Sequence, residues 1–259
     1  MGLEEHIVIT PPERPSALRG NTVAAAHPGY SIDREGHLVG PEGCCRRGGW
    51  LLLGRGRVWD GSRRAEGLCR DLLRMCAARA FCGVLLTGPG RFIPRLEEAL
   101  ARQGLRLLVP ERCAGLVKTA GVYLSSAISG GCLEDRLAEG LDRFGPERLT
   151  LLLEQSTEDF FLPAPTGCGQ PLTPEDLQEL KNRWNPCIFF SSPLCARYFT
   201  YMSRETGAHF VLFDDRDTLT RKLERARAAG VRSFLHPSPE GAAGLPLTAA
   251  GDGGKIGPS

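Results

Sequence analysis

Three carboxylates near the end of one strand-like run are the residues most suited to acid–base chemistry. Glu154, Glu158 and Asp159 lie within or just after the apolar run 149–155. Two carboxyl groups whose pKa values differ can act as general acid and general base on one substrate. The sequence shows no matched carboxylate on a second strand, so the alternative is that these are polar loop residues that cap hydrogen bonds. Glu154 and Asp159 are therefore the catalytic candidates.

Other side chains at strand ends could contact a ligand. Ser125 and Ser126 end one strand-like run and lead into a Ser/Gly segment, whose backbone N–H groups could hold an anion. Ordinary helix capping explains the same residues and stays the alternative. Trp59, Phe160 and Phe161 follow two further strand-like runs, where aromatic rings could stack on a sugar ring, although exposed loop aromatics also occur without a ligand.

Histidines and cysteines are the residues that could hold a metal ion. His27 and His236 end two strand-like runs, but no spacing supports a metal site, and a hydrogen-bonded rim residue is the commoner role. The ten cysteines include no C-x-x-C pair, so zinc and dithiol sites have little support. We expect no metal and no cofactor. The ligand-binding candidates are thus Trp59, Ser125, Ser126, Glu154, Phe160 and His236.

The cysteines and the first residues bear on the compartment. Several cysteines fall inside apolar stripes, where a free thiol behaves as a small hydrophobic side chain. Only the adjacent pair Cys44 and Cys45 invites a special role. Residues 1–10 carry Glu4, Glu5 and His6, where a signal peptide would be basic and then apolar. We expect reduced thiols and a cytoplasmic location.

The charge balance argues against two classes of partner. Lys and Arg number 32 against 30 for Asp and Glu, and the arginines are scattered among acidic residues. A nucleic-acid-binding protein usually carries a basic stripe, and none is visible. No apolar run approaches the roughly 18 residues that a membrane span needs. We expect neither nucleic acid nor a membrane span.

Short apolar runs alternate with helical patterns along most of the chain. Most runs are unbroken, as in strands that are buried on both faces of a parallel sheet. The predicted strands are 6–10, 22–27, 50–54, 84–87, 105–110, 122–126, 149–155 and 231–236. Apolar stripes with the helical period predict helices that end near Ala80, Gly104, Gly145 and Gly230. A further helix is expected to start at Thr173, which can cap it.

This alternation predicts one (β/α)8 barrel, with a doubly wound open sheet as the alternative. Three additional strand candidates at 187–191, 198–202 and 210–214 predict a small β-hairpin insertion between the seventh and eighth barrel strands, at about 187–215. From Ser238 onward the chain offers little to bury. We therefore expect a barrel domain over 1–237 and a disordered tail over 238–259.

The last third of the chain resembles the carboxyl-terminal part of glycoside hydrolase family 18 barrels, particularly the bacterial spore-cortex-lytic and germination type. The matching segments are RYFTY at 197–201, GAHFVLFDD at 207–215 and the helical segment 219–230. In that family a YFxY…G…H.VWFED hairpin precedes the last barrel helix. Upstream, 149–163 and 50–88 are similar to the seventh strand and to the region around the third helix, so the resemblance covers 50–236.

The resemblance also reveals a departure at the family's catalytic motif. Members that cleave glycans carry D-x-x-D-x-D-x-E at the end of the fourth strand, where the Glu is the general acid and the neighbouring Asp orients the acetamido group. Strand residues two apart point to the same side, so these carboxylates converge. The corresponding positions here are Cys82, Leu85, Thr87 and Pro89. None of the four can donate a proton to a glycosidic oxygen at neutral pH.

Other positions of the family pattern are changed as well. The sixth-strand Tyr and Asp are replaced within Leu-Ser-Ser-Ala at 124–127, and the eighth-strand Trp falls near His236. The resemblance thus implies a non-hydrolytic pseudoenzyme with a carbohydrate-binding or structural role, connected with sporulation. One alternative is a glycan hydrolase with a relocated acid at Glu154 or Asp159. Another is a barrel recruited to an unrelated small molecule bound at the carboxyl ends of its strands. The sequence does not indicate an oligomeric state.

Overall fold

Eight parallel strands form a closed barrel. The computed structural model describes residues 4–11, 23–41, 46–54, 64–163 and 169–247. The strand order is β1-β14-β8-β7-β6-β5-β4-β2. The last strand of this order, β2, also pairs with the first, β1, and this pairing closes the barrel. The strands are β1 (Glu5–Ile9), β2 (Val23–Ile32), β4 (Trp50–Leu53), β5 (Gly83–Leu86), β6 (Arg106–Pro110), β7 (Gly121–Ser125), β8 (Leu149–Leu152) and β14 (Ser233–His236). The predicted (β/α)8 barrel is confirmed, and the open sheet is not observed.

The chain divides into two compact units, which are described in turn. The first unit holds β1, β2, β4, β5, β6 and β14, together with the short strand β3 (Leu38–Val39), which pairs with the end of β2. Its helices are α1 (Ala65–Arg79), α2 (Ile93–Ala101), the 3-10 helix η1 (Glu111–Leu116) and α6 (Pro239–Ala242). A 3-10 helix therefore follows β6, where the barrel pattern would place an α-helix.

The core of the first unit follows from its unbroken apolar runs. All four residues of β4 and all four of β5 are buried, as expected of strands covered on both faces. Leu68, Leu72 and Cys76 lie four residues apart and form the buried stripe of α1. This helix ends at Arg79, and the capping residue Ala80 adopts the left-handed conformation with φ 54°.

A buried carboxylate fixes the chain after η1. The Glu97 side chain of α2 is 8% exposed and accepts hydrogen bonds from the backbone N–H groups of Lys118, Thr119 and Ala120, at 2.7–3.0 Å. The Thr119 hydroxyl adds another hydrogen bond at 3.0 Å. Burial alone would raise the pKa of Glu97, but these four donors outweigh it and lower that pKa.

The second unit holds β7, β8, α3 (Leu133–Phe144), α4 (Pro174–Trp184), α5 (Arg216–Ala229) and a five-stranded antiparallel sheet. The sheet order is β10-β9-β13-β12-β11. Its strands are β9 (Thr157–Phe161), β10 (Gln170–Pro171), β11 (Phe189–Ser191), β12 (Ala196–Ser203) and β13 (Gly207–Phe213). The predicted hairpin is present as β12 and β13, but the inserted structure begins at Thr157 rather than near 187.

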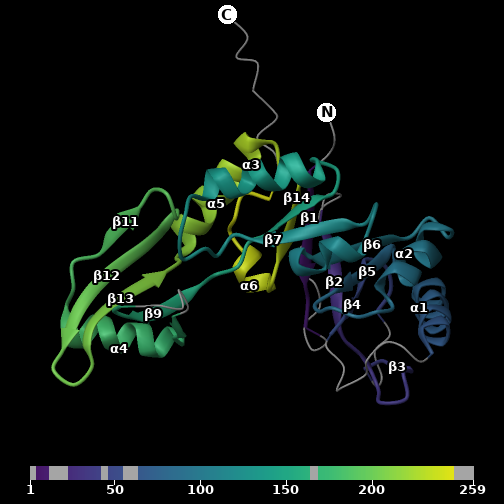
Figure 1. Cartoon of the computed structure of the whole chain (residues 1–259), viewed down its shortest axis with the longest axis horizontal. Helices are drawn as coiled ribbons and strands as arrows, with labels where there is room; N and C mark the ends of the chain where they lie inside the picture. Colours follow the sequence, from purple (N-terminus) through teal and green to yellow (C-terminus); the bar gives the residue numbers. More distant parts are fainter. Residues whose placement is uncertain (1–3, 12–22, 42–45, 55–63, 164–168, 248–259) are drawn as a thin grey trace, which may run out of the picture. The chain divides into compact units, whose positions relative to one another are not determined.

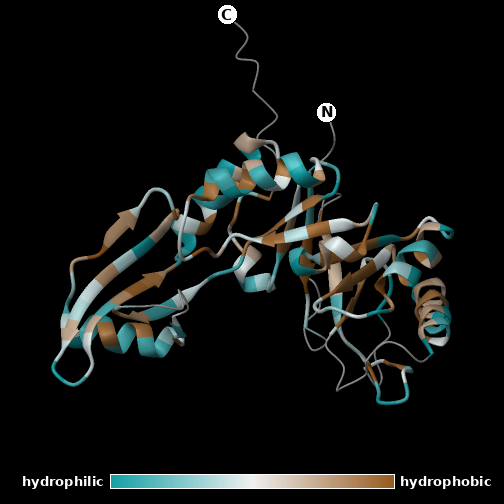
Figure 2. Cartoon of the chain, in the orientation of Figure 1, coloured by the Kyte–Doolittle hydropathy of each residue, from teal (hydrophilic) through white to brown (hydrophobic). Residues whose placement is uncertain are grey.

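Helix α4 covers one face of this sheet (Figure 1). Phe199, Val211 and Phe213 form a buried cluster, against which Leu177 and Leu180 of the helix pack. Figure 2 shows hydrophobic and hydrophilic residues alternating along α4, as in a helix with one face on a sheet. The helix begins after Thr173, the predicted cap, and Thr173 and Asp176 exchange hydrogen bonds in a capping box.

The expected disordered tail is partly wrong. Residues 239–242 form α6, because Ser238 caps this short helix and Ala242 and Leu245 are buried. Residues 248–259 lie outside the described part of the chain.

The cysteines that the structure describes are free thiols. They are Cys69, Cys76, Cys82, Cys113, Cys132, Cys187 and Cys195, whereas Cys44, Cys45 and Cys168 lie outside the described residues. Burial raises the pKa of Cys76 to about 11, which keeps this thiol protonated at neutral pH.

Candidate functional site

The carboxyl end of β5 presents no acidic group at the motif positions. Leu85 is buried with 1% of its surface exposed, and Cys82 and Pro89 lie outside the strand on either side. Thr87 follows β5 and donates a hydrogen bond from its hydroxyl to the Leu53 carbonyl at 3.4 Å. This end of β5 therefore offers an apolar side chain, a hydroxyl that is already bonded, and a proline.

Two adjacent strands of the second unit bring three of the predicted residues together. Ser125 ends β7, Ser126 follows it, and Glu154 follows β8, which pairs with β7 in parallel. The Ser125 hydroxyl donates to Glu154 Oε2 at 2.8 Å, and the Glu154 backbone N–H donates to Ser126 Oγ at 3.3 Å. Glu154 is exposed, whereas Ser126 is completely buried. Only the carboxylate of this group is available to a ligand as an exposed charged side chain.

The second catalytic candidate, Asp159, is held within the inserted sheet. Its carboxylate accepts a hydrogen bond from the Tyr201 hydroxyl at 2.8 Å and lies 2.9 Å from His209 Nδ1. His209 Nε2 is in turn 2.8 Å from the Thr206 hydroxyl. Burial, followed by the Asp159 carboxylate, raises the pKa of Tyr201, which keeps the phenol protonated as a donor. Asp159 thus holds β9, β12 and β13 together and forms no hydrogen bond with Glu154 in the described chain.

The two candidate histidines occupy interior positions. His27 was expected at the end of its strand, but β2 continues to Ile32, with an irregular register after His27. His27 Nε2 lies 3.0 Å from the carbonyl of Gly48, which precedes β4, so this histidine is not at the carboxyl end of the strands. Burial lowers the pKa of His27.

His236 ends β14 but is completely buried. Its Nε2 lies 2.9 Å from Nδ1 of His6, and His6 Nε2 lies 2.6 Å from Glu4 Oε1. The first unit therefore contains a continuous buried line of a carboxylate and two imidazoles. Trp59, the remaining candidate of the first unit, lies outside the described residues.

An aromatic ladder crosses the sheet of the second unit. It consists of Phe189 in β11, Tyr198 in β12, Phe210 in β13 and Phe160 in β9, with ring centroids 5.5, 5.2 and 6.1 Å apart in that order. Side chains alternate across a strand, and Phe199 and Val211 face α4, so the ladder lies on the other face. Phe189 is 51% exposed and Phe160 is 6% exposed.

The ladder contains one residue that the sequence singled out. Phe160 was a candidate, but its neighbours in the ladder were not, because β11, β12 and β13 were considered only as an insertion. Tyr198 and Phe210 are partly exposed, and the ring of Tyr198 stacks on both Phe189 and Phe210. Phe161, the other predicted aromatic, points to the opposite face and contacts the edge of His209, with ring centroids 4.6 Å apart.

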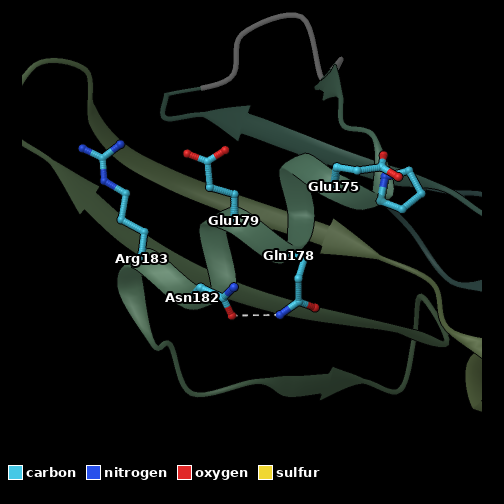
Figure 3. A pocket seen from close by; sticks show the side chains of 6 residues that line it. Glu175, Gln178, Glu179, Asn182 and Arg183 are labelled. Carbon is cyan, nitrogen blue, oxygen red and sulfur yellow. Dashed lines mark hydrogen bonds between the residues drawn. The ribbon is translucent and has the colours of Figure 1, made fainter.

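A shallow polar depression lies on the outer side of α4 (Figure 3). It is lined by Pro174, Glu175, Gln178, Glu179, Asn182 and Arg183. Gln178 donates to the Asn182 side-chain carbonyl at 2.9 Å, and the labelled side chains extend away from the helix. These residues belong to one helix and do not converge on a common point.

The described part of the chain offers neither a cluster of metal ligands nor a membrane-spanning helix. No group of three or more His, Cys, Asp or Glu side chains there could hold a metal ion. No helix there is long and apolar enough to cross a membrane.

Comparison with solved structures identifies proteins that share this fold. The spore cortex-lytic enzyme SleL of Bacillus megaterium QM B1551 is 12% identical with a TM-score of 0.63, over 92% of this chain and 72% of that one. A chitinase from Chromobacterium violaceum ATCC 12472 is 15% identical with a TM-score of 0.63, over 95% and 96%. A variant of the class V chitinase of Nicotiana tobaccum, solved in complex with NAG4, is 11% identical with a TM-score of 0.63, over 95% and 97%.

At these identities the similarity establishes the fold alone. No protein-family model matches the chain, and no curated protein matches it. The barrel architecture expected from the family 18 resemblance is therefore confirmed, whereas the chemistry must be argued from the residues present.

Proposed function

We propose that this chain is a glycan-binding barrel of the family 18 type that does not hydrolyse its ligand. The observation that carries the proposal is the end of β5, where Leu85, Thr87 and Pro89 occupy positions at which the related hydrolases carry acids. Leu85 is buried and the Thr87 hydroxyl is bonded to a backbone carbonyl, so neither supplies a proton to a leaving sugar. The likeness to chitinases and to a spore cortex-lytic enzyme supports a glycan ligand and a role in sporulation.

The aromatic ladder supports binding without catalysis. Stacking on a ring needs no proton donor, and aromatic contacts contribute about 0.5–1.5 kcal/mol beyond their buried area. Phe189 and Tyr198 offer the exposed end of the ladder, whereas Phe160 is buried and supports the rings next to it. We assign the stacking of a sugar ring to Phe189, whose ring Tyr198 supports from within the ladder.

Binding of a chitooligosaccharide tests this assignment. Isothermal titration calorimetry with N-acetylglucosamine tetramer is expected to show binding, and Phe189→Ala and Tyr198→Ala are each expected to weaken it by about 3–10-fold. Phe161→Ala is the matched control, because Phe161 is 50% exposed, close to the 51% of Phe189, but lies on the opposite face. Binding that is absent, or that Phe161→Ala weakens as much as Phe189→Ala does, contradicts the assignment.

A glycan hydrolase that uses Glu154 is the second candidate function. Its support is that Glu154 is an exposed carboxylate at the carboxyl end of a barrel strand, the edge at which barrel enzymes carry their active sites. The Ser125 hydroxyl donates a hydrogen bond to Oε2 of this carboxylate at 2.8 Å and so occupies one of its two oxygens. In the described chain no hydrogen bond joins Glu154 to a second carboxyl or to a histidine.

A further inference from the structure

A cavity of about 340 Å³ lies in the first unit between the turn after β2 and the amino-terminal half of α1. Its size falls within the range of about 300–1,000 Å³ that small-molecule sites occupy. Arg70 and Arg74 of α1 line it, together with Arg64, which immediately precedes the helix, and His37 lines it from the turn. Its acidic lining residues are Glu66 and Asp71.

The acidic residues of the cavity have other partners. Glu66 lies four residues before Arg70, a spacing that favours an ion pair within a helix. Instead, its Oε1 accepts a hydrogen bond from Arg95 of α2 at 2.9 Å. Asp71 Oδ2 lies 3.9 Å from Nδ1 of His37. Arg64 donates a hydrogen bond to Nε2 of the same histidine.

Among the residues that the structure describes, Arg70 and Arg74 have no counter-charge paired with them. Within the described part of the chain neither guanidinium forms an ion pair or a hydrogen bond, although both line the same cavity. The two are four residues apart on one helix, an arrangement in which like charges destabilise the helix. A bound anion would remove this repulsion and would occupy both guanidinium groups.

We propose that this cavity binds a phosphate group, either free or carried on a sugar. A guanidinium presents planar, paired N–H donors that match the oxygens of a phosphate, and charge-assisted hydrogen bonds of this kind are about twice as strong as neutral ones. Arg70 and Arg74 are the two ligands, and Arg64 adds positive charge at the edge of the cavity. This site is separate from the aromatic ladder, which belongs to the other unit.

Calorimetric titration with three probes tests the site and its ligand. Inorganic phosphate, N-acetylglucosamine 6-phosphate and uncharged N-acetylglucosamine are compared at low ionic strength, on the full chain and on Arg70→Ala/Arg74→Ala. Arg79→Ala is the control, because Arg79 is on the same helix but does not line the cavity. We expect the double variant to weaken phosphate binding at least tenfold, Arg79→Ala to leave it within twofold, and about 0.5 M NaCl to weaken it in the parent chain.

The outcomes distinguish the sources of the phosphate. Equal binding of both phosphate probes indicates a site for the free anion, and binding of the sugar phosphate alone indicates a phosphorylated sugar. Binding of neither phosphate, or binding that the double variant retains in full, overturns the proposal. We expect Arg70→Ala/Arg74→Ala to bind the N-acetylglucosamine tetramer as the parent chain does. That result would show that the phosphate site and the proposed glycan site are tested independently of each other.

Discussion

Replacement of Lys222 by methionine is expected to destabilise the chain by about 3–5 kcal/mol. Lys222 and Asp214 are 1% and 3% exposed, and Lys222 Nζ lies 2.8 Å from Asp214 Oδ2. The same carboxylate accepts hydrogen bonds from the Thr218 hydroxyl at 2.9 Å and the Ser156 backbone N–H at 3.2 Å. Without Lys222 the aspartate becomes a buried charge that no other described cation pairs with. Denaturant unfolding followed by circular dichroism measures the change.

Two control variants separate the loss of charge compensation from the loss of packing. Arg221→Met changes the residue just before Lys222, which forms an exposed ion pair with Asp217 at an N–O distance of 3.1 Å. This substitution should lower the free energy of unfolding by less than about 1 kcal/mol. Lys222→Met/Asp214→Asn removes both charges and should recover a large part of the lost stability. A double variant as unstable as Lys222→Met alone would show that packing, and not the unpaired charge, is responsible.

Replacement of Glu97 by alanine is expected to cost about 2–4 kcal/mol, because three backbone N–H groups and one hydroxyl lose their common acceptor. Glu98→Ala is the control. Its carboxylate is exposed and lies 3.7 Å from Arg102, so its loss should cost less than about 0.5 kcal/mol. Equal effects of the two substitutions in urea unfolding would contradict the role assigned to Glu97.

The contribution of Glu97 should also depend on pH. Its pKa is lowered in the folded chain from the ordinary value of 4.5, so the unfolded chain takes up the proton first as the pH falls. The stabilisation is therefore fully present above pH 4.5 and disappears as the pH falls through the folded-state pKa. The difference in unfolding free energy between the parent and Glu97→Gln should shrink below about pH 4.

The barrel was predictable because its strands are unbroken apolar runs. Such runs can be recognised from the local sequence alone, without knowledge of distant partners. All four residues of Leu149–Leu152 are apolar or Thr, and three of the four are buried. Strand β9 was not predicted, because Thr157–Phe161 carries two acidic residues in five. Asp159 is tolerated there because Tyr201 and His209, which come much later in the chain, satisfy its carboxylate. Such a partnership has no local signature in the sequence.

The candidate sites were predictable to different degrees for the same reason. Ser125, Ser126 and Glu154 end adjacent parallel strands, so their proximity follows from the barrel pattern. The aromatic ladder depends on the register of four antiparallel strands, although the alternation around Tyr198 and Phe210 could have indicated a shared face. The cavity lined by Arg70 and Arg74 lies between α1 and the turn at His37. These segments are separate in the sequence, so no residue spacing indicates that they come together.

Hydrolysis of a fluorogenic chitobioside by the purified chain tests the central claim most directly. Loss of a general acid alone forfeits roughly 10²–10⁴ in rate, and the carboxylate that orients the acetamido group is absent from the motif positions as well. We predict that the parent chain and Glu154→Gln both release fluorophore at the rate of the enzyme-free control. Turnover by the parent chain that disappears in Glu154→Gln would contradict the claim and would identify Glu154 as a relocated acid.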